Sequence, residues 1–317
     1  MDISSSEGSR SVHGFPGPTE LRPRALVTGA TGYIGSRLAR GLIDAGWIVS
    51  GLTRGLSRPA GGTTDDIAML STDGSFESVR DAVVATRPTV IFHLAAAVVA
   101  VPRAEDVDQL VRSNVMLIAQ LTEAMREVGT DCLVNTGSYW QFAADGSVHP
   151  RTLYAATKSA AEEIVRFNTA RGLRAATLIL HDVYGPNDPR PKLLNRLVDL
   201  DPTSAAIELT SGQQILDYVY VDDVVRAYTA VAAGLLDRSG GSHEQFMVRG
   251  GHPRTLRAVV EMLESARGVT LPLNWGARPH QDHDIMVPWL GGRQVPGWEP
   301  IVALEEGRRR MVDATSS

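Results

Sequence analysis

A short apolar run followed at once by a glycine-rich turn constrains this chain more than any other stretch. Residues 25–35 read ALVTGATGYIG, and Leu38, Leu42 and Ile43 then recur at helical spacing. This order predicts a strand, a tight turn and a helix. A second apolar run at residues 47–52 extends the prediction to a β-α-β unit, which builds parallel α/β sheets.

The glycines of this turn have separate expected roles. Gly29 permits the tight turn, Gly32 lets a pyrophosphate approach the backbone, and Gly35 lets the helix pack closely against the strand. The free amides and the positive end of that helix then face the phosphates of a dinucleotide. On its own, the pattern also fits an ordinary strand-to-helix turn. The predicted cofactor contacts in the turn are Gly29, Thr31, Gly32, Tyr33, Ile34 and Gly35.

The composition argues against several classes of protein. The 317 residues are 43% hydrophobic and 21% charged, which suits one large α/β domain or a domain with a smaller lobe. The net charge of -5 does not indicate binding to nucleic acid or to a membrane surface. No stretch reaches the ~18 consecutive apolar residues of a membrane span. Residues 1–23 are rich in Ser, Gly and Pro without an apolar core, so we expect a disordered leader and a cytoplasmic protein.

Cysteine and histidine usage argues against disulfide and metal chemistry. Cys132 is the only cysteine, which excludes an internal disulfide and a cysteine-based metal cluster. It lies in an apolar run, so we interpret it as a buried small hydrophobic residue rather than a nucleophile. The eight histidines are scattered without metal-ligand spacing, and no metal site is expected.

The end of the second predicted strand bears on the choice of cofactor. An acidic residue at this position hydrogen-bonds the ribose 2′-hydroxyl in NAD-binding proteins of this type. Here the position corresponds to Thr53, and Arg54 follows. A hydroxyl and a guanidinium suit a 2′-phosphate, which a carboxylate would repel. We therefore predict a preference for NADP(H), with NAD(H) possible; the alternative is that Arg54 is a solvated loop arginine.

Residues 89–96 form an apolar run that predicts another buried parallel strand. We interpret His93 as a packed strand histidine. The small residues at the end of the run let the strand approach a cofactor, and the predicted contacts are Leu94, Ala95 and Ala96. Asn114, at the start of a helical pattern, either shapes the backbone near the site or lies on a helix surface.

Tyr154 and Lys158 begin a long helical pattern some 20 residues after the start of a predicted strand at residues 133–140. Residues four apart share one helical face. A phenol with a pKa of ~10 is a poor acid or base near neutrality, and a neighbouring ammonium is expected to lower that pKa. A hydroxyl at the end of the preceding strand would complete the arrangement. Any Tyr-x-x-x-Lys pair by itself also fits a solvated helix surface.

These features together resemble the short-chain dehydrogenase/reductase superfamily, and the order of glycine turn, strand-end hydroxyl and Tyr-x-x-x-Lys is that of its triad. The ungapped match of residues 134–140 implies that Thr136 is the third catalytic residue beside Tyr154 and Lys158, with Ser138 as the second choice. The resemblance also implies that Lys158 holds the nicotinamide ribose. Sugar-nucleotide dehydratases carry an Asp-Glu pair after the threonine, whereas this chain has Gly137 and Ser138, which argues against dehydration.

The second half resembles the extended members of that superfamily. Residues 182–187 read DVYGPN, with Asp182 in place of the usual asparagine, and residues 212–224 and 297–300 match further signatures. The resemblance covers residues 24–312. It implies a sugar-nucleotide site with the predicted contacts Ser138, Asp182, Arg190 and Lys192. Arg190 and Lys192 equally fit solvated loop charges.

Two acidic positions are expected to be structural. Asp222 and Asp223 precede a helical pattern and are interpreted as its N-terminal cap. Asp73 is interpreted as a plain loop aspartate rather than as a contact of the adenine.

The sequence thus predicts an α/β protein with a Rossmann-type doubly wound parallel sheet and a smaller C-terminal substrate lobe. We expect the dinucleotide-binding core at residues 24–180 and the lobe at 181–317, with a segment near 215–235 returning to the core. The chain most resembles nucleotide-sugar 4-ketoreductases such as abequose and paratose synthases, which implies NADPH-dependent reduction of a nucleotide-linked 4-keto-6-deoxyhexose by a homodimer. The alternatives are a nucleotide-sugar 4-epimerase with tightly bound NAD and a non-catalytic dinucleotide sensor.

Overall fold

A computed structural model describes residues 22–55 and 67–315 of the chain. Most of the predicted leader, residues 1–21, lies outside the described residues. Within the described parts, no helix combines the length and the apolar character needed to cross a membrane.

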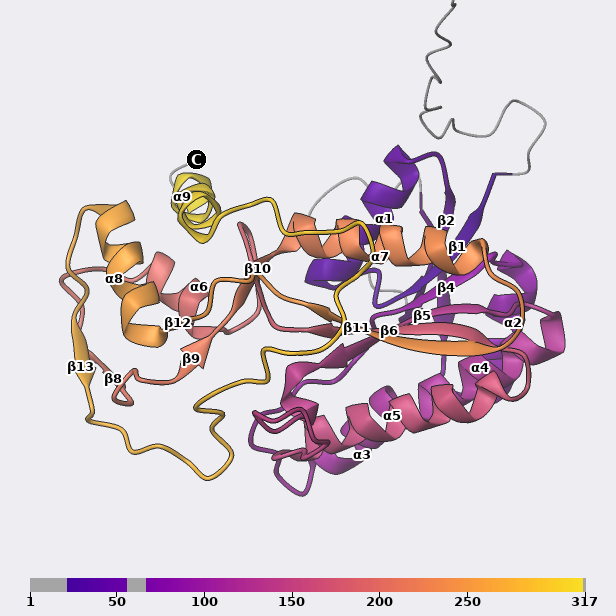
Figure 1. The fold of residues 1–317 in the computed structure, drawn as a ribbon, viewed down its shortest axis with the longest axis horizontal. Coiled ribbons are helices and arrows are strands. Elements are labelled where there is room, and N and C mark those ends of the chain that lie inside the picture. Colours follow the sequence, from indigo (N-terminus) through magenta and orange to yellow (C-terminus); the bar gives the residue numbers. More distant parts are fainter. Residues whose placement is uncertain (1–21, 56–66, 316–317) are drawn as a thin grey trace, which may run out of the picture.

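A seven-stranded parallel sheet forms the core, in the order β11-β6-β5-β4-β1-β2-β3 (Figure 1). The strands are β1 (Arg24–Thr28), β2 (Ile48–Arg54), β3 (Ala68–Thr72), β4 (Val90–His93), β5 (Cys132–Ser138), β6 (Arg174–Leu180) and β11 (Ser242–Val248). The chain proceeds outward from β1 to β3 and then returns to place β4 on the other side of β1. This reversal is the topological switch point of a doubly wound sheet, so the predicted Rossmann-type fold is confirmed.

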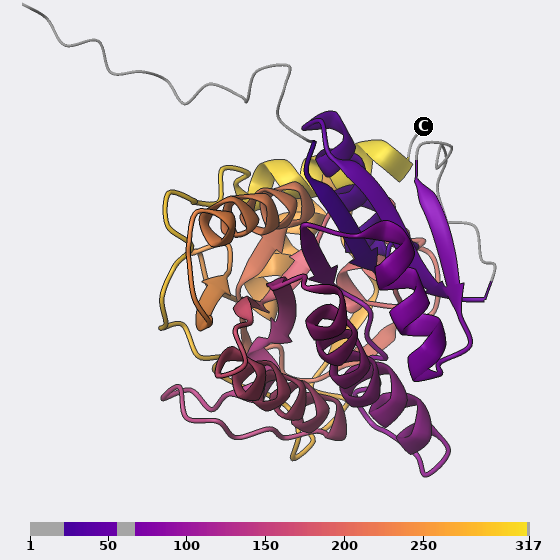
Figure 2. The ribbon, with the colours of Figure 1, turned by 90° about the vertical axis from the view of Figure 1, so that its right-hand side faces the viewer.

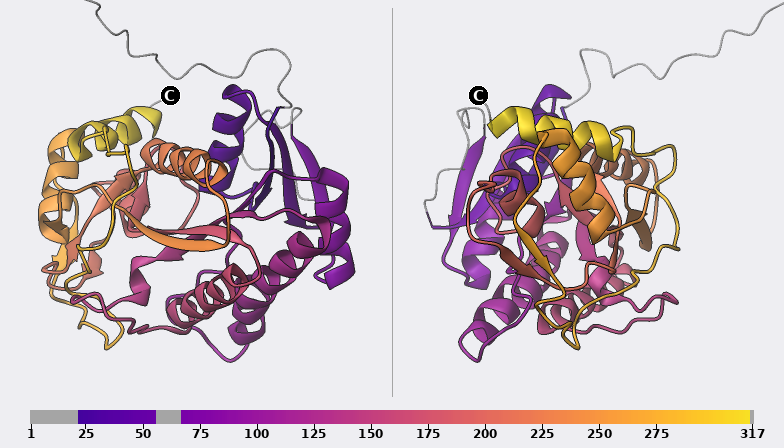
Figure 3. Two further views of the ribbon diagram at one scale, coloured as in Figure 1. Left: turned by 45° about the vertical axis from the view of Figure 1, so that its right-hand side comes forward. Right: turned by 90° about the vertical axis from the view of Figure 1, so that its left-hand side faces the viewer.

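Helices cover both faces of the sheet, as Figures 2 and 3 show. One face carries α1 (Tyr33–Asp44) and α7 (Val221–Leu236), and the other carries α2 (Phe76–Thr86), α4 (Leu117–Val128) and α5 (Leu153–Thr169). Short α3 (Asp106–Val111) and the π-helical turn η1 (Arg112–Met116) lead into α4.

Strand residues alternate between these two layers. On β1, Ala25 and Val27 pack in the core under α1 and α7, whereas Leu26 packs under α2 and α4. Both faces of a parallel sheet are covered by helices, which is why its strands are apolar throughout. Cys132 is fully buried on β5, as predicted, and burial raises the pKa of its thiol to about 11.

A smaller lobe occupies the left of Figure 1. It contains α6 (Leu193–Val198), α8 (Leu256–Arg267), α9 (Leu304–Thr315) and the strand pairs β8 (Ile207–Leu209) with β13 (Leu273–Trp275) and β9 (Ile215–Leu216) with β12 (Arg254–Thr255). Strands β7 (Asp182–Tyr184) and β10 (Tyr218–Tyr220) pair at its junction with the core. The chain returns to the core through α7 and also through β11, which extends to Val248, beyond the segment expected at about 215–235.

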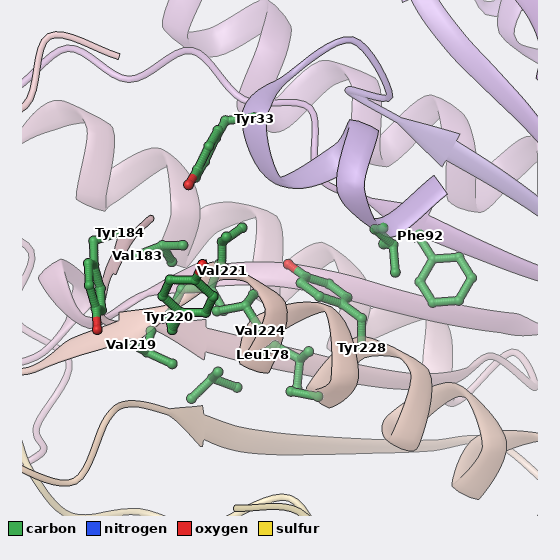
Figure 4. Packing of buried hydrophobic residues seen from close by; sticks show 14 of the residues in the cluster. Tyr33, Phe92, Leu178, Val183, Tyr184, Val219, Tyr220, Val221, Val224 and Tyr228 are labelled. Atoms are coloured by element: carbon green, nitrogen blue, oxygen red, sulfur yellow. The ribbon is translucent and has the colours of Figure 1, made fainter. Parts of the chain in front are cut away.

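Aromatic side chains fill that junction. Tyr184 is almost fully buried, and its ring meets Tyr218 and Tyr220 edge to face, with centroids 5.7 and 5.5 Å away (Figure 4). Apolar contacts of this kind fix the position of the lobe against the sheet.

The predicted capping role of Asp222 and Asp223 is wrong. The N-cap of α7 is Tyr220, with no side-chain cap. The buried Asp223 carboxylate instead accepts from the backbone N–H groups of Ile301 and Val302, at 3.2 and 3.1 Å, and so fastens the C-terminal segment to α7. A sequence window does not show this role, because the partners lie almost 80 residues away.

Candidate active site

The glycine turn lies where β1 ends and α1 begins. Gly29 has φ +72°, and a Cβ at this residue would lie 2.9 Å from the backbone nitrogen of Ala95. A Cβ at Gly35 would lie 2.1 Å from the Gly29 carbonyl oxygen. Gly32 is the N-cap of α1 and supplies no side-chain cap, which leaves the amides of the first turn for another partner. The turn therefore fits the pyrophosphate of a dinucleotide.

The end of β4 is fastened to this turn. The Thr28 hydroxyl lies 2.8 Å from His93 Nδ1 and accepts from the Ala95 N–H at 3.1 Å. Residues 94–96 thereby run beside the glycine turn, where the sequence placed their cofactor contacts. His93 is buried, as predicted, and burial together with the Lys158 charge lowers its pKa to about 3. The imidazole is consequently neutral at pH 7.

Thr53 and Arg54 both lie in β2, at its carboxyl end. Arg54 Nη1 donates to the Ser113 hydroxyl of η1 at 3.1 Å, so the guanidinium is held beside the strand end. Asp73 has a structural role, as expected. Its carboxylate accepts from the Ser75 N–H and from the Ser78 hydroxyl at the start of α2, and these bonds lower its pKa to about 2.

Tyr154 and Lys158 lie on α5, and both are buried, with 9% and 2% of their surface exposed. Burial raises the pKa of Tyr154, while a hydrogen bond with Ser138 and the charge of Arg190 lower it in part. The predicted lowering of the phenol pKa is therefore wrong, because desolvation outweighs the favourable partners. Tyr154 is protonated at neutral pH and is available as an acid.

The Lys158 ammonium forms no hydrogen bond with another described residue of the protein. Burial lowers its pKa to about 8, and the negative charge of Glu162 opposes this shift. A buried cation without an acceptor is costly unless a ligand supplies one. Ribose hydroxyls of a dinucleotide would serve, so this position also fits the predicted cofactor.

The two candidate hydroxyls on β5 have different surroundings. The Thr136 hydroxyl donates to the His93 carbonyl at 2.7 Å, so it accepts from the Tyr228 hydroxyl at 2.6 Å. Tyr228 comes from α7 and packs edge to face on Phe92 (Figure 4). Ser138, the last residue of β5, lies close enough to Tyr154 for its hydroxyl to lower the pKa of the phenol. The structure thus brings Ser138 to the phenol, whereas the Thr136 hydroxyl is saturated by protein groups.

Asn114 is buried in η1 and shapes the backbone, which was one of its two predicted roles. Its side chain accepts from the Ala97 N–H at 2.8 Å and donates to the Ala97 carbonyl at 3.0 Å and the Thr157 hydroxyl at 2.9 Å. The loop after β4 is thereby tied to α5 between Tyr154 and Lys158. Single-turn π-helices often occur at functional sites.

The predicted substrate contacts are engaged within the protein. Asp182 accepts from the Tyr139 hydroxyl at 3.0 Å. Arg190 forms a bidentate pair with Asp188, with N–O distances of 2.7 and 2.6 Å, and stacks on the ring of Tyr33.

Lys192 Nζ donates to the Val183 carbonyl at 3.1 Å, and burial lowers the pKa of this lysine. Arg190 and Lys192 are thus not solvated loop charges. They hold the loop after β7 in place.

A cavity of about 300 Å³ lies in the lobe and was not found by sequence reasoning. Its walls come from α6, β8, the start of α8 and the loop after β13. Two arginines that are far apart in the sequence, Arg196 and Arg278, line this cavity. The lining residues are Pro191, Leu193, Arg196, Ile207, Glu208, Leu209, Thr210, Gln214, Leu256, Arg278 and Asp284.

Comparisons with known proteins agree with this architecture. The sequence profile of the NAD dependent epimerase/dehydratase family matches residues 25–241. A CDP-abequose synthase from Yersinia pseudotuberculosis is 25% identical over 276 residues, which are 84% of this chain and 91% of that protein. A UDP-glucose 4-epimerase from Mycolicibacterium smegmatis is 29% identical over 92% of this chain and 97% of its own length. The crystal structure of the Thermus thermophilus UDP-glucose 4-epimerase complex with NAD superposes with a TM-score of 0.79 at 25% identity, covering 93% of this chain and 99% of that one.

Proposed function

Because the chain belongs to the NAD dependent epimerase/dehydratase family and is an enzyme of the short-chain dehydrogenase/reductase type, we propose that it reduces a nucleotide-linked 4-keto-6-deoxyhexose with NADPH. The observation that carries this proposal is a buried phenol at Tyr154, which lies beside Ser138 and one helical turn from the Lys158 ammonium and whose pKa is raised by burial. Reduction of a ketone requires a proton donor at the oxygen, and a phenol with a raised pKa holds its proton at neutral pH.

Bound NADPH supplies the hydride for the keto carbon. Tyr154 donates its proton to the carbonyl oxygen of the sugar as negative charge develops there. Ser138 donates a hydrogen bond to the same oxygen and so replaces Thr136 in our assignment of the triad. Lys158 binds the ribose hydroxyls and keeps a positive charge beside the phenol. Asn114 holds the loop and the helix that surround these groups.

The preference for NADPH rests on the end of β2. Thr53 and Arg54 offer a hydroxyl and a guanidinium and no carboxylate, and Ser113 holds the guanidinium near the strand end. This combination suits a 2′-phosphate. Binding of NAD(H) is the alternative for this cofactor site.

We place the nucleotide of the substrate in the lobe cavity. Its volume of about 300 Å³ and its mixed polar lining suit a nucleotide, and Arg196 and Arg278 offer charge to a diphosphate. We move the diphosphate role to these arginines because Arg190 and Lys192 already have partners within the protein. Asp182 and Ser138 are then the proposed contacts of the sugar.

The alternative reaction is 4-epimerisation of a nucleotide sugar with retained NAD. One observation favours it: the Mycolicibacterium smegmatis UDP-glucose 4-epimerase is as similar to this chain as the CDP-abequose synthase. The non-catalytic sensor is disfavoured, because Tyr154 and Lys158 are both present and buried together.

The experiment that separates the two reactions uses NADPH oxidation across a panel of nucleotide-linked keto sugars, with the products identified by NMR. Reduction of a 4-keto-6-deoxyhexose supports the proposal. Interconversion of epimers without added cofactor supports the alternative.

We further propose a homodimer. Apolar side chains are exposed on the helices that follow β4 and β5, namely Val107, Val111, Met116 and Phe167. Burial of these side chains against a second copy would remove them from water. A cytoplasmic location stays a prediction, based on the single cysteine. Sedimentation equilibrium tests the dimer, and Phe167→Glu is expected to shift it toward monomer.

A further inference from the structure

Ser138 is held by a glutamine that the proposed reaction does not otherwise use. The Ser138 N–H donates to Gln141 Oε1 at 2.8 Å, and the Ser138 hydroxyl oxygen accepts from the Trp140 N–H at 3.3 Å. These bonds form a capping box at the turn η2 (Tyr139–Gln141). Because the hydroxyl oxygen accepts from Trp140, its own proton stays free to donate on the side of Tyr154, where the proposed reaction places the sugar carbonyl oxygen.

The Gln141 amide satisfies its two neighbours in one orientation only. Its Nε2 donates to Glu162 Oε2 at 3.0 Å while its Oε1 accepts from Ser138. A flipped amide would turn its oxygen toward the carboxylate and its NH₂ group toward the Ser138 N–H. Glu162 therefore sets the orientation of the amide that holds Ser138.

Glu162 itself is firmly placed. It is 4% exposed and lies on α5, four residues after Lys158. Its other oxygen, Oε1, accepts from Gln245 Nε2 at 2.6 Å and lies 3.4 Å from Arg166 Nη2. Burial of a carboxylate is tolerated because these donors compensate its charge.

Gly137 provides the space for this arrangement. A Cβ at Gly137 would lie 2.9 Å from Gln141 Oε1 and 2.3 Å from Ile179 Cδ1. A side chain here would displace the amide from the Ser138 N–H. The absence of a side chain at residue 137 is thus a condition for the contact between β5 and α5.

We propose that Gln141 and Glu162 are positioning residues for the reaction. Glu162 orients Gln141, and Gln141 holds the backbone of Ser138 so that its hydroxyl stays beside Tyr154. Glu162 thereby connects α5, which carries Tyr154 and Lys158, to the strand that carries Ser138. This inference rests on the proposed role of Ser138 and Tyr154 in catalysis.

A charge-swap cycle tests the inference. Q141E alone puts two buried carboxylates in contact. E162Q alone replaces a group that only accepts with an amide that can also donate, so it no longer fixes the orientation of Gln141. Both are expected to lower kcat by at least ~10²-fold, the loss typical of a misplaced hydrogen-bond donor at a developing oxyanion, with KM nearly unchanged. In the double variant Q141E/E162Q, the carboxylate at 141 accepts from the Ser138 N–H and from the new amide at 162. Activity is then expected to return to within ~10-fold of wild type, a coupling that independent sites do not show.

Gln245→Glu is the matched control. It places the same additional carboxylate against Glu162, but on Oε1, away from Ser138. Its melting temperature should fall about as far as that of Q141E, while its kcat should fall much less. Equal losses of kcat in both variants would contradict the inference, as would a double variant no more active than Q141E. Melting temperature and the NADPH dissociation constant show whether each variant is folded.

Two further measurements distinguish a failure of this inference from a failure of the proposed reaction. If the wild-type enzyme interconverts epimers but reduces no keto sugar, the proposed reduction is wrong, and the same cycle is run on epimerisation. Crystal structures of the wild type and of Gln141→Leu need no turnover at all. The Ser138 hydroxyl is expected to rotate away from Tyr154 in the variant, and an unchanged rotamer would overturn the inference.

Discussion

Thr136 and Ser138 stand two residues apart on β5, and their hydroxyls have different partners. Thr136 connects the His93 carbonyl to the Tyr228 hydroxyl of α7, whereas the Ser138 hydroxyl lies beside Tyr154 of α5 and lowers the pKa of its phenol. The Thr136 hydroxyl thus connects the sheet to α7, and the Ser138 hydroxyl lies beside Tyr154, the proposed proton donor. This division makes the two residues separable by mutation.

Ser138→Ala is expected to lower kcat by ~10²–10³-fold, because it removes a donor aimed at the developing oxyanion. Thr136→Val is expected to destabilise the fold by about 1–3 kcal/mol, because it leaves the buried Tyr228 hydroxyl without the Thr136 hydroxyl as its partner. Its kcat should stay within several-fold of wild type. Urea denaturation and steady-state kinetics on both variants measure the contrast. The reverse pattern would restore Thr136 as the third catalytic residue.

The buried Lys158 ammonium is expected to lower the free energy of unfolding, although the proposed reaction requires it. Its pKa falls from the ordinary 10.5 to about 8 on burial, so the charged form costs roughly 3 kcal/mol in the fold at pH values below 8. Lys158→Met should therefore be more stable than wild type at pH 7 and inactive. The stability difference should shrink as pH rises from 8 toward 10.5, because the lysine then loses its proton in the unfolded state as well.

The pH dependence of wild-type activity should reflect the protonation of the same Lys158 ammonium. Since Lys158 acts as a cation, kcat/KM is expected to fall as pH rises through about 8, whereas His93, neutral above its pKa of about 3, should add no inflection near neutrality. A profile that stays flat to pH 10 would show that the charge of Lys158 is not required.

Arg54→Ala tests the proposed preference for NADPH. The loss of one charge-assisted contact to a 2′-phosphate is expected to raise KM for NADPH by roughly 10-fold and to leave KM for NADH nearly unchanged. Arg22→Ala is a suitable control, because Arg22 binds the backbone carbonyl of Gly46 instead. An equal effect of Arg54→Ala on both cofactors would refute the assignment.

Much of the fold and two of the three residues of the candidate triad could be proposed from the sequence because they depend on local spacing. The glycine turn of residues 29–35 and the Tyr154–Lys158 pair each lie within seven residues of sequence. Hydrophobic periodicity predicts local structure well over such short windows. The buried state of His93 and Cys132 followed from apolar runs. The helices that begin after these turns and the burial of His93 and Cys132 are confirmed, whereas the catalytic and cofactor roles stay predictions.

The remaining features depend on distant partners. The raised pKa of Tyr154 reflects burial by several elements, which no short window shows. The choice between Thr136 and Ser138 depends on where β5 ends, and the Ser-x-x-Gln capping pattern formed with Gln141 was the available indication. The lobe cavity combines residues from 191 to 284, so its arginines were not recognisable in advance.

Arg278→Ala tests the lobe cavity as the nucleotide site. The loss of one arginine contact to a diphosphate is expected to raise KM for the nucleotide sugar by ~10-fold or more while kcat changes little, because the contact is equally strong in the ground state and the transition state. Arg254→Ala, an exposed arginine of the same lobe outside the cavity lining, should leave KM unchanged. Equal KM values for both variants and wild type would place the nucleotide elsewhere.

The most direct measurement of the central claim follows one hydrogen atom. NADPH carrying deuterium at the transferred position is mixed with the enzyme and a nucleotide-linked 4-keto-6-deoxyhexose, and the sugar product is examined by NMR. We expect deuterium on carbon 4 of the sugar, and in Tyr154→Phe a slower transfer by ~10²–10⁴-fold with cofactor binding retained. Absence of deuterium from the sugar, or transfer at the wild-type rate without the phenol, would contradict the proposed function.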